Sequence, residues 1–586
     1  MDADGREKGV WVAELILLTA LHLVLTGLPL AAAALLGARA GVRSVPLLLA
    51  LGLAGASLAA FLAFWAYWGE PLLGESFSYF LLIGSVAAIG WSLRTGGIDA
   101  GLLRRLALPA SLWALASTFV VFLGFVHGGT EDPIATSTVR FSHPLPGDSQ
   151  IPFFYSEWFF QHGHEGRPPV FPGEWLFSDR PPLQVGFVLA QRPFAVGNVE
   201  LNYQVLGVIL QQLWVVGLWA LLLAARVRPL TRGLAAFAVL LSDLAILNGF
   251  FVWPKMLPAA LVLALAAMVL TPLWDEVRGS TPAAVLAGAL AALAMLGHGS
   301  AVFGIVPLAL LALWRGLPSG RWIGVGVAVA VVLMGCWSAY QKWGDPPGNR
   351  VVKWMLAGVL EVDDRGVLEA VRDSYRQAGF DGALRYKEEN FRTMIGAKPT
   401  ADILRATVES DHLGDAVRNL RVLQFFYLLP SLGLLLLGPV LMAVRPRARE
   451  RQPQEWRLAL LCLAVFAVGA VIWGLAIFGS PEATTVKHIS GYALPVLGIV
   501  GCVVGLRAVF PRFGLWFAVA VSLLNLAIYA PALDPPAGSS YSVVAIAVSA
   551  LALAGFALLA FGPARRDGSA DSGDAASPTR EPAVAA

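Results

Sequence analysis

Long apolar stretches alternate with short polar ones along most of the chain. Most apolar stretches run for about 20 residues with almost no charge, the length that an α-helix needs to cross the hydrocarbon core of a bilayer. The pattern therefore predicts an all-α polytopic membrane protein with about fifteen transmembrane helices. The predicted spans lie near residues 10–37, 45–68, 77–94, 106–126, 203–225, 233–252, 256–274, 281–297, 300–314, 321–341, 421–444, 456–479, 489–508, 513–531 and 541–562.

Two long polar stretches interrupt this alternation and divide the chain into parts. The parts are an N-terminal four-helix segment (1–126), a first large loop (127–202), a central bundle (203–341), a second large loop (342–420), a C-terminal bundle (421–562) and a tail (563–586). The tail is rich in Ser, Ala, Asp and Pro, and this composition predicts disorder. The second loop has helical spacing near 364–378, 381–394 and 400–419. These helices form either a small cap over the membrane domain or interfacial segments of a solvated connector.

The arginines of the short connecting loops indicate the orientation of the chain. They recur in every second loop and after the last span, at Arg39, Arg43, Arg94, Arg104, Arg105, Arg226, Arg228, Arg232, Arg315, Arg321, 445–451, Arg507, Arg512, Arg565 and Arg566. Basic short loops stay in the cytoplasm. We therefore expect a multi-pass plasma-membrane protein with its N-terminus outside, both large loops extracytoplasmic and the tail cytoplasmic.

Composition excludes several classes of protein. With 57% hydrophobic and 14% charged residues and a mean hydropathy of +0.68, the chain is no ordinary soluble domain. The net charge of +3 is too small to indicate a nucleic-acid partner. All three cysteines fall within apolar stretches, which argues against a disulfide framework.

The segment 143–184, within the first large loop, is the longest aromatic, proline-rich and acid-bearing segment of the chain. Its two leading prolines and Gly147 interrupt any helix and place Asp148 at a turn. A short aromatic helix over 149–161 then begins with Asp148 as its N-cap and lies on the membrane face. Gly163 ends this helix.

This order of elements resembles the GT-C superfamily of membrane glycosyltransferases. In that family an outer loop carries a catalytic Asp or an acidic pair, followed by an interfacial helix, a glycine and a Pro-Pro-Leu element. The corresponding positions here are Gly147–Asp148, 149–161, Gly163 and Pro181–Pro182–Leu183. Two features differ from the family pattern: four spans precede the loop instead of one, and Ser149 stands where many members have a second acid.

The resemblance implies an inverting transfer of a sugar from a polyprenyl-phosphate donor to a glycan, lipid or protein acceptor of the cell envelope. Asp148 would be the base that deprotonates the acceptor hydroxyl. Asp179 would be a distant second acid. The alternatives are a plain helix cap for Asp148 and an ion pair with Arg180 for Asp179.

The lipid-phosphate leaving group needs positive charge beside it. We expect Arg180, Lys255, Lys487 and His488 to supply this charge, because each lies at the outer edge of a span or in the first loop. A divalent cation, Mg²⁺ or Mn²⁺, could do the same, but the sequence assigns no set of metal ligands.

Three further residues of the first loop are predicted to contact substrate. Glu157 lies on the aromatic helix, and Trp158 and Trp175 could stack on sugar rings. The alternatives are a solvent-facing acid and tryptophans that anchor the loop at the membrane interface.

Two other functions share this layout. A flippase or transporter for lipid-linked glycans also has many spans, although internal repeats and mid-membrane charges are its usual signs. A polymerase or ligase of the outer face would use Arg and His residues of a late loop, and the second loop offers Arg350, Arg372, Arg376 and His412.

Overall fold

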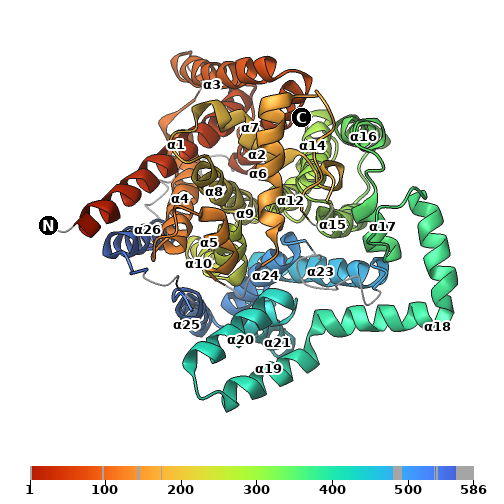
Figure 1. Cartoon of the computed structure of the whole chain (residues 1–586). Helices are drawn as coiled ribbons and strands as arrows, with labels where there is room; N and C mark the ends of the chain where they lie inside the picture. Colours follow the sequence, from red (N-terminus) through yellow and green to blue (C-terminus); the bar gives the residue numbers. More distant parts are fainter. Residues whose placement is uncertain are drawn as a thin grey trace, which may run out of the picture.

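A computed structural model describes residues 3–95, 98–141, 145–172, 175–479, 491–533, 535 and 539–562, with side chains from Trp11 onward. The described chain is helical, and its extended pairing is limited to an isolated bridge between Phe171 and Trp175. Four long helices come first: α1 (Ala3–Arg39), α2 (Val45–Gly69), α3 (Pro71–Arg94) and α4 (Ala100–Gly124). Figure 1 shows the remaining helices gathered beside and below them.

Short helices build the first large loop, and longer ones follow in the central bundle. The loop holds α5 (Pro133–Val139), a 3-10 turn (Gly147–Gln150), α6 (Ile151–His162), a second 3-10 turn (Phe177–Asp179), α7 (Leu183–Gln191) and a third 3-10 turn (Arg192–Phe194). The bundle holds α8 (Val199–Gln211), α9 (Trp214–Ala224), α10 (Pro229–Leu240), a π-helical turn (Leu244–Asn248), α11 (Gly249–Phe251), α12 (Met256–Val269), α13 (Leu273–Val277), α14 (Thr281–Gly297), a 3-10 turn (Gly299–Ala301), α15 (Val302–Arg315), α16 (Gly320–Ala339) and a π-helical turn (Tyr340–Gly344).

The second large loop and the C-terminal bundle complete the fold. The loop contains α17 (Arg350–Ala357), α18 (Val367–Ile395), α19 (Ala397–Glu409) and α20 (Leu413–Phe426). The bundle contains a 3-10 segment (Pro430–Leu436), α21 (Leu437–Val444), α22 (Ala448–Arg451), α23 (Pro453–Ala476), α24 (Ala493–Val509), α25 (Pro511–Tyr529) and α26 (Val543–Phe561). Two predicted helices of the loop merge into α18 across a bend at Gly379, and the third divides into α19 and α20. The predicted disordered tail lies outside the described residues.

The polytopic membrane class is confirmed. In the part of the chain that the structure describes, nine helices are long and apolar enough to span a membrane, or eleven if two bent pairs each count as one span. Four shorter apolar helices, α12, α14, α15 with its preceding 3-10 turn, and α24, coincide with predicted spans. The predicted count of fifteen remains a prediction.

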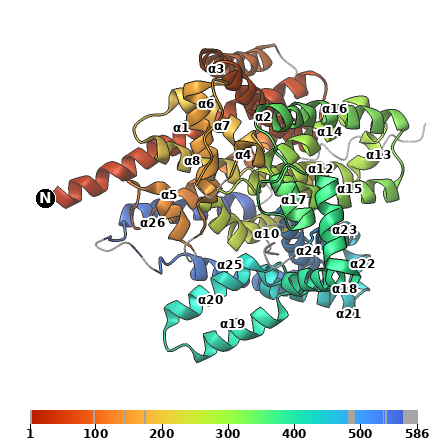
Figure 2. The ribbon, with the colours of Figure 1, turned by 45° about the vertical axis from the view of Figure 1, so that its right-hand side comes forward.

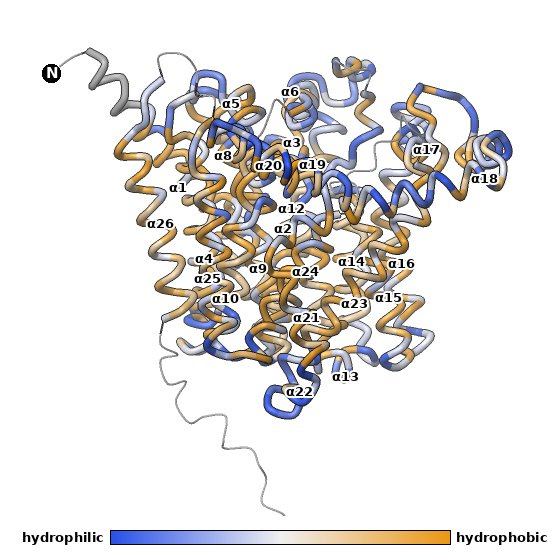
Figure 3. The backbone as a smooth tube through the Cα atoms, turned by 90° about the horizontal axis from the view of Figure 1, so that it is seen from below, coloured by the Kyte–Doolittle hydropathy of each residue, from blue (hydrophilic) through white to orange (hydrophobic). Residues whose placement is uncertain are grey.

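Both large loops lie on the same face of the molecule. Figure 3 shows the apolar helices side by side as a belt, with α5, α6, α17 and α18 at one end and α13 and α22 at the other. We call the end with the two large loops the loop face, and the end with the short arginine-containing loops the basic face.

The centre of the bundle is tightly packed around α8, α9 and α12. The span formed by α8 and α9 is buried throughout, whereas α3 and α16 lie at the periphery and bury few of their residues (Figure 2). Glycines allow the close approach that membrane helices need. A Cβ added to Gly217 of α9 would lie 2.2 Å from the carbonyl oxygen of Ala260 in α12. A Cβ added to Gly186 of α7 would lie 2.1 Å from the carbonyl oxygen of Ala60 in α2. The short helix α7 is buried along its whole length, so the chain enters the bundle directly after Pro181 and Pro182.

Candidate functional site

Asp148 is held in an ion pair at the loop face. It lies inside the 3-10 turn Gly147–Gln150, and its Oδ2 accepts a hydrogen bond from Arg180 Nη2 at 3.1 Å. The two side chains are 19% and 18% exposed. The predicted N-cap role is wrong, because the helical turn begins one residue earlier and neither it nor α6 has a side-chain cap.

The ion pair opens into a narrow cavity where the first loop meets the bundle. The cavity is lined by Asp148, Ile151, Pro152, Phe177, Arg180, Pro181, Gln184, Val185, Trp253, Pro254 and His298. Its walls come from the turn before α6, the start of α7, the break between α11 and α12, and the end of α14. Asp148 alone is acidic among these residues, so the cavity presents one carboxylate between apolar and cationic walls.

Lys255 and His298 extend the polar side of the cavity. Lys255 precedes α12, is 3% exposed, and holds its Nζ 3.4 Å from the centre of the Trp253 ring. It interacts electrostatically with both Asp148 and Arg180. His298 Nδ1 accepts a hydrogen bond from the Ser300 N–H at 3.1 Å, so a neutral imidazole carries its proton on Nε2. A carboxylate, a guanidinium, a buried amine and an imidazole donor are thus placed together.

A chain of buried hydrogen bonds fixes the turn before α6 against the start of α12. The Tyr203 hydroxyl donates to the Ser149 carbonyl, and Gln184 Nε2 donates to the Tyr203 oxygen at 3.3 Å. Gln211 Nε2 donates to Gln184 Oε1 at 3.0 Å, and Gln211 Oε1 accepts from the Met256 N–H at 2.9 Å. Asp148 and Lys255 are therefore positioned by one continuous network.

The backbone between α11 and α12 is strained at Val252. Its φ of 51° is a left-handed conformation that a β-branched residue rarely adopts. Its carbonyl accepts a hydrogen bond from Gln184 Nε2 at 3.1 Å. This left-handed residue ends α11, and the chain then places Trp253 and Pro254 in the cavity wall, with Lys255 directly after them.

Asp179 lies in different surroundings from Asp148. Its Oδ2 accepts the Leu176 N–H at 3.0 Å, and its Oδ1 is buried without a hydrogen-bond partner among the described residues. Burial raises the pKa of its carboxyl, against the lowering effects of the Leu176 N–H, Arg350 and Arg180. The alternative of an Asp179–Arg180 ion pair is wrong, because the Arg180 guanidinium turns to Asp148.

Trp175 holds Arg180 in place. The Arg180 guanidinium lies 4.3 Å from the centre of the Trp175 ring, and that of Arg350 lies 4.6 Å from it. The ring therefore packs against two cations. The structure gives Trp175 a positioning contact with the ion pair, and its predicted contact with a sugar stays a prediction.

Glu157 and Trp158 lie on the other side of α6 from Asp148. The Glu157 carboxylate accepts two hydrogen bonds from Arg192, at 2.6 and 3.0 Å, and Trp158 stacks on His162 with ring centres 4.0 Å apart. Both line a second cleft of about 380 Å³ with aromatic and amide side chains, among them Phe153. The two predicted substrate contacts are thus placed together, but away from the cavity of Asp148.

The second loop supports the first through residues that the sequence analysis did not single out. Asp345 Oδ2 accepts the Ser178 N–H at 3.0 Å, and its Oδ1 accepts from Arg167 Nε at 2.9 Å. Asp345 follows a π-helical turn in a Gly-Asp-Pro-Pro sequence, which indicates a turn but no partner. His298 was also missed as a site residue, although its Gly-His-Gly setting between two apolar stretches is a signal of a polar break.

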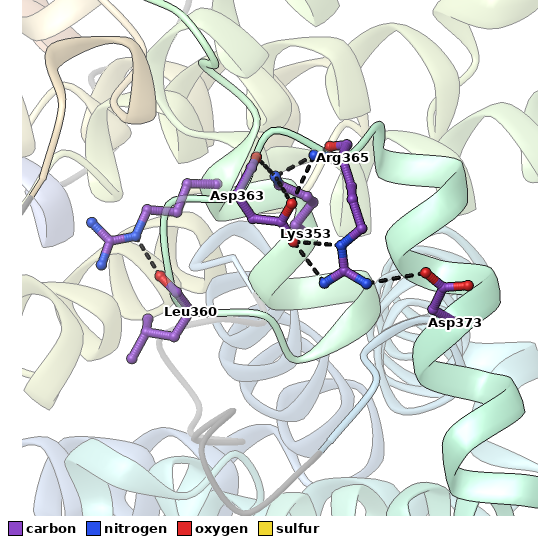
Figure 4. A network of polar contacts seen from close by, with 6 residues as sticks. Lys353, Leu360, Asp363, Arg365 and Asp373 are labelled. Atoms are coloured by element: carbon purple, nitrogen blue, oxygen red, sulfur yellow. Dashed lines mark hydrogen bonds and ion pairs between the residues drawn. The ribbon is translucent and has the colours of Figure 1, made fainter.

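The cations of the second loop stabilise its own connector. Lys353 is fully buried and donates to the Asp363 and Arg365 carbonyls, while Arg365 pairs with Asp363 and Asp373 (Figure 4). Arg350 donates to the Leu360 carbonyl at 2.5 Å. Other cationic residues considered for a polymerase or ligase, Arg372, Arg376 and His412, are exposed.

A divalent cation does not fit these residues. In the described ranges no three His, Cys, Asp or Glu side chains come together as metal ligands. Asp148 is also already paired with the Arg180 guanidinium, whose charge would repel a metal ion. Lys487 and His488, both predicted to bind the phosphate, lie outside the described residues.

No protein-family model matches the chain, and neither a curated protein nor a solved structure shows significant similarity to it.

Proposed function

We propose that this protein is a membrane glycosyltransferase of the GT-C type. It moves a sugar from a polyprenyl-phosphate donor to an envelope acceptor at the loop face, which in this proposal faces out of the cell. One observation carries the proposal: the carboxylate of Asp148 lies in a cavity at the end of an apolar bundle, paired with Arg180 and near the buried amine of Lys255. A lipid donor needs an apolar environment that ends at positive charge, and the acceptor needs a base.

The ion pair suggests how the donor prepares the base. The donor phosphate binds Arg180 and Lys255, and it replaces Asp148 as the anionic partner of the Arg180 guanidinium. The carboxylate is then available to an acceptor hydroxyl. As the hydroxyl oxygen attacks the anomeric carbon, Asp148 accepts the proton and the bond to the phosphate oxygen breaks. The polyprenyl phosphate leaves with the bonding electrons and is stabilised by the same two cations.

The other residues of the two clefts act around this centre. His298 directs its Nε2 proton as a hydrogen-bond donor toward phosphate or sugar. Trp175 keeps Arg180 in place. Glu157 and Trp158 bind a part of the acceptor in the cleft on the other side of α6, where an aromatic ring and a carboxylate match the faces and hydroxyls of a sugar.

The test is transfer from a panel of radiolabelled polyprenyl-phosphate sugars by the full-length protein in nanodiscs. Asp148→Asn removes the basicity and keeps the shape, so we expect transfer to fall by about 10²-fold or more. The matched control is Asp132→Asn, because Asp132 caps α5 in the same loop and Asn caps equally well. A folded and fully active Asp148→Asn variant would refute the proposal. Movement of a lipid-linked glycan between leaflets without transfer would favour the flippase instead.

A further inference from the structure

Residues 380–409, the second part of α18 and all of α19, form a segment that we call the arm. It runs along the periphery of the loop face (Figures 1 and 2). The arm begins after Gly379, whose φ of 65° interrupts the helical backbone of α18. Gly396, with a φ of 64°, makes the second bend, between α18 and α19. The course of the arm is thus set by two glycines in left-handed conformations.

Hydrogen bonds to the end of a span fix the level of the arm. Asn390 Nδ2 donates to the Gly474 and Ile477 carbonyls at 2.9 and 2.8 Å, and Lys387 Nζ donates to the Ile477 carbonyl at 2.5 Å. These carbonyls are at the C-terminal end of α23, a 24-residue apolar helix, where they have no partner within the helix. The arm therefore crosses α23 at the level where that helix leaves the hydrocarbon.

The α18 part of the arm has three distinct sides. Phe380, which is 82% exposed, shares an exposed apolar side with Leu384 and Ile395. At 3.6 residues per turn, charged residues occupy the next side, and the buried residues that pack on the bundle occupy the third. The charged side comprises Asp381, Arg385, Glu388, Glu389 and Arg392.

The α19 part is amphipathic and has no buried residue. Ala401, Leu404 and Val408 recur at helical spacing and are exposed, Val408 by 85%. Charged residues recur at the same spacing one position later, at Asp402, Arg405 and Glu409. A run of exposed large apolar side chains of this kind marks a contact surface.

We infer that the arm lies in the membrane interface of the loop-face leaflet, with Phe380, Leu384, Leu404 and Val408 inserted among the lipids. Figure 3 shows α18 and α19 lying across the end of the apolar belt, at its edge. Between positions 380 and 409 there are five Lys or Arg and five Asp or Glu, so anionic headgroups give no net attraction. Apolar burial therefore drives the insertion, and the occupant of the apolar side is the acyl–headgroup boundary. This inference is independent of the proposed glycosyltransferase activity.

The test uses nitroxide labels on single cysteines in the full-length protein, with the exposed Cys336 replaced by Ala. Labels go to positions 380, 384, 404 and 408, and collision with oxygen is compared with collision with a water-soluble nickel chelate. Positions 385 and 402 of the charged side are the matched controls, and exposed Val331 of the peripheral span α16 is the lipid-facing reference.

We expect the four apolar positions to report depths of about 5–10 Å below the headgroups, and the two charged positions to report water. The depths should be equal in vesicles of phosphatidylcholine and in vesicles with added phosphatidylglycerol. Access of the nickel chelate to positions 380 and 408 would overturn the inference, since the arm would then project into water. Shielding from both reagents, with spin–spin broadening between labels, would also overturn it and indicate a second copy of the chain.

Discussion

The Asp148 carboxylate and the Arg180 guanidinium meet at 3.1 Å although 32 positions of the chain separate them. The first residue lies before α6 and the second lies before α7, so the contact closes the aromatic part of the first loop. Trp175 supports the arginine, and Lys255 adds charge from the bundle. In the proposed function, Arg180 and Lys255 receive the anionic phosphate, and Asp148 is released as the base.

Replacing Arg180 tests the binding of the donor phosphate. Arg180→Gln removes one of the two cations beside the leaving group, so we expect donor use to fall by about 10²-fold, measured as kcat/KM for the donor. Arg372→Gln removes an exposed arginine of the second loop and should leave donor use unchanged. Equal activity of both variants would exclude Arg180 from the phosphate site.

Gln211 tests whether the buried network positions the cavity. Gln211→Leu leaves the N–H groups of Met256 and Leu257 at the start of α12 without their acceptor. Each buried unsatisfied donor costs about 1–3 kcal/mol, so the thermal unfolding midpoint in detergent should fall. Gln211→Glu keeps an acceptor oxygen and, with its buried carboxyl protonated, a donor to Gln184 Oε1, so it should lose less stability at pH 5. Equal midpoints for the two variants would contradict this assignment of the hydrogen bonds.

The sidedness can be tested with an impermeant maleimide in intact cells. Cysteines at Val170 and Glu369, both exposed on the loop face and outside the arm, should be labelled directly if that face is extracytoplasmic. A cysteine at Glu450, exposed in α22 on the basic face, should be labelled only after permeabilisation. The reverse pattern would place the loop face in the cytoplasm and exclude the proposed donor class.

The membrane fold was predictable because about 20 apolar residues in succession have few other structures open to them. All fifteen predicted spans fall on apolar helices or bent helix pairs. Short helices at the centre were less predictable, since α12 and α24 are surrounded by protein and need not match the bilayer thickness. The bend at Gly379 falls at the predicted boundary between the helical pieces 364–378 and 381–394, because a glycine beside a change of helical pattern marks a break.

The candidate site was predictable in part. Asp148, Arg180 and Lys255 were found from their positions at a turn or at the end of a span. The contact between the first two was not found, because Asp179 is the nearest acid to Arg180 in the sequence. Asp345 was missed for a similar reason, since its partners Ser178 and Arg167 are 167 and 178 positions away. Long-range pairing of this kind has no local signal in a single sequence.

Asp179 gives a prediction about pH that separates its role from that of Asp148. Burial raises the pKa of its carboxyl above the unfolded value of about 3.9, so between the two values the folded protein binds more protons than the unfolded chain. Its contribution to stability is present in full below about pH 4 and is lost as the pH rises through the folded pKa.

Asp179→Asn cannot titrate, and its amide oxygen still accepts the Leu176 N–H. We therefore expect its unfolding midpoint to rise relative to the wild type between pH 4 and pH 7.5, with transfer reduced less than in Asp148→Asn.

Asp179→Ala also lacks the titration but leaves the Leu176 N–H without an acceptor, and should lose about 1–3 kcal/mol relative to Asp179→Asn at both pH values. If the difference in unfolding midpoint between Asp179→Asn and the wild type is the same at pH 4 and pH 7.5, the carboxylate remains charged in the fold. Asp179 could then serve as the second acid that the sequence suggested.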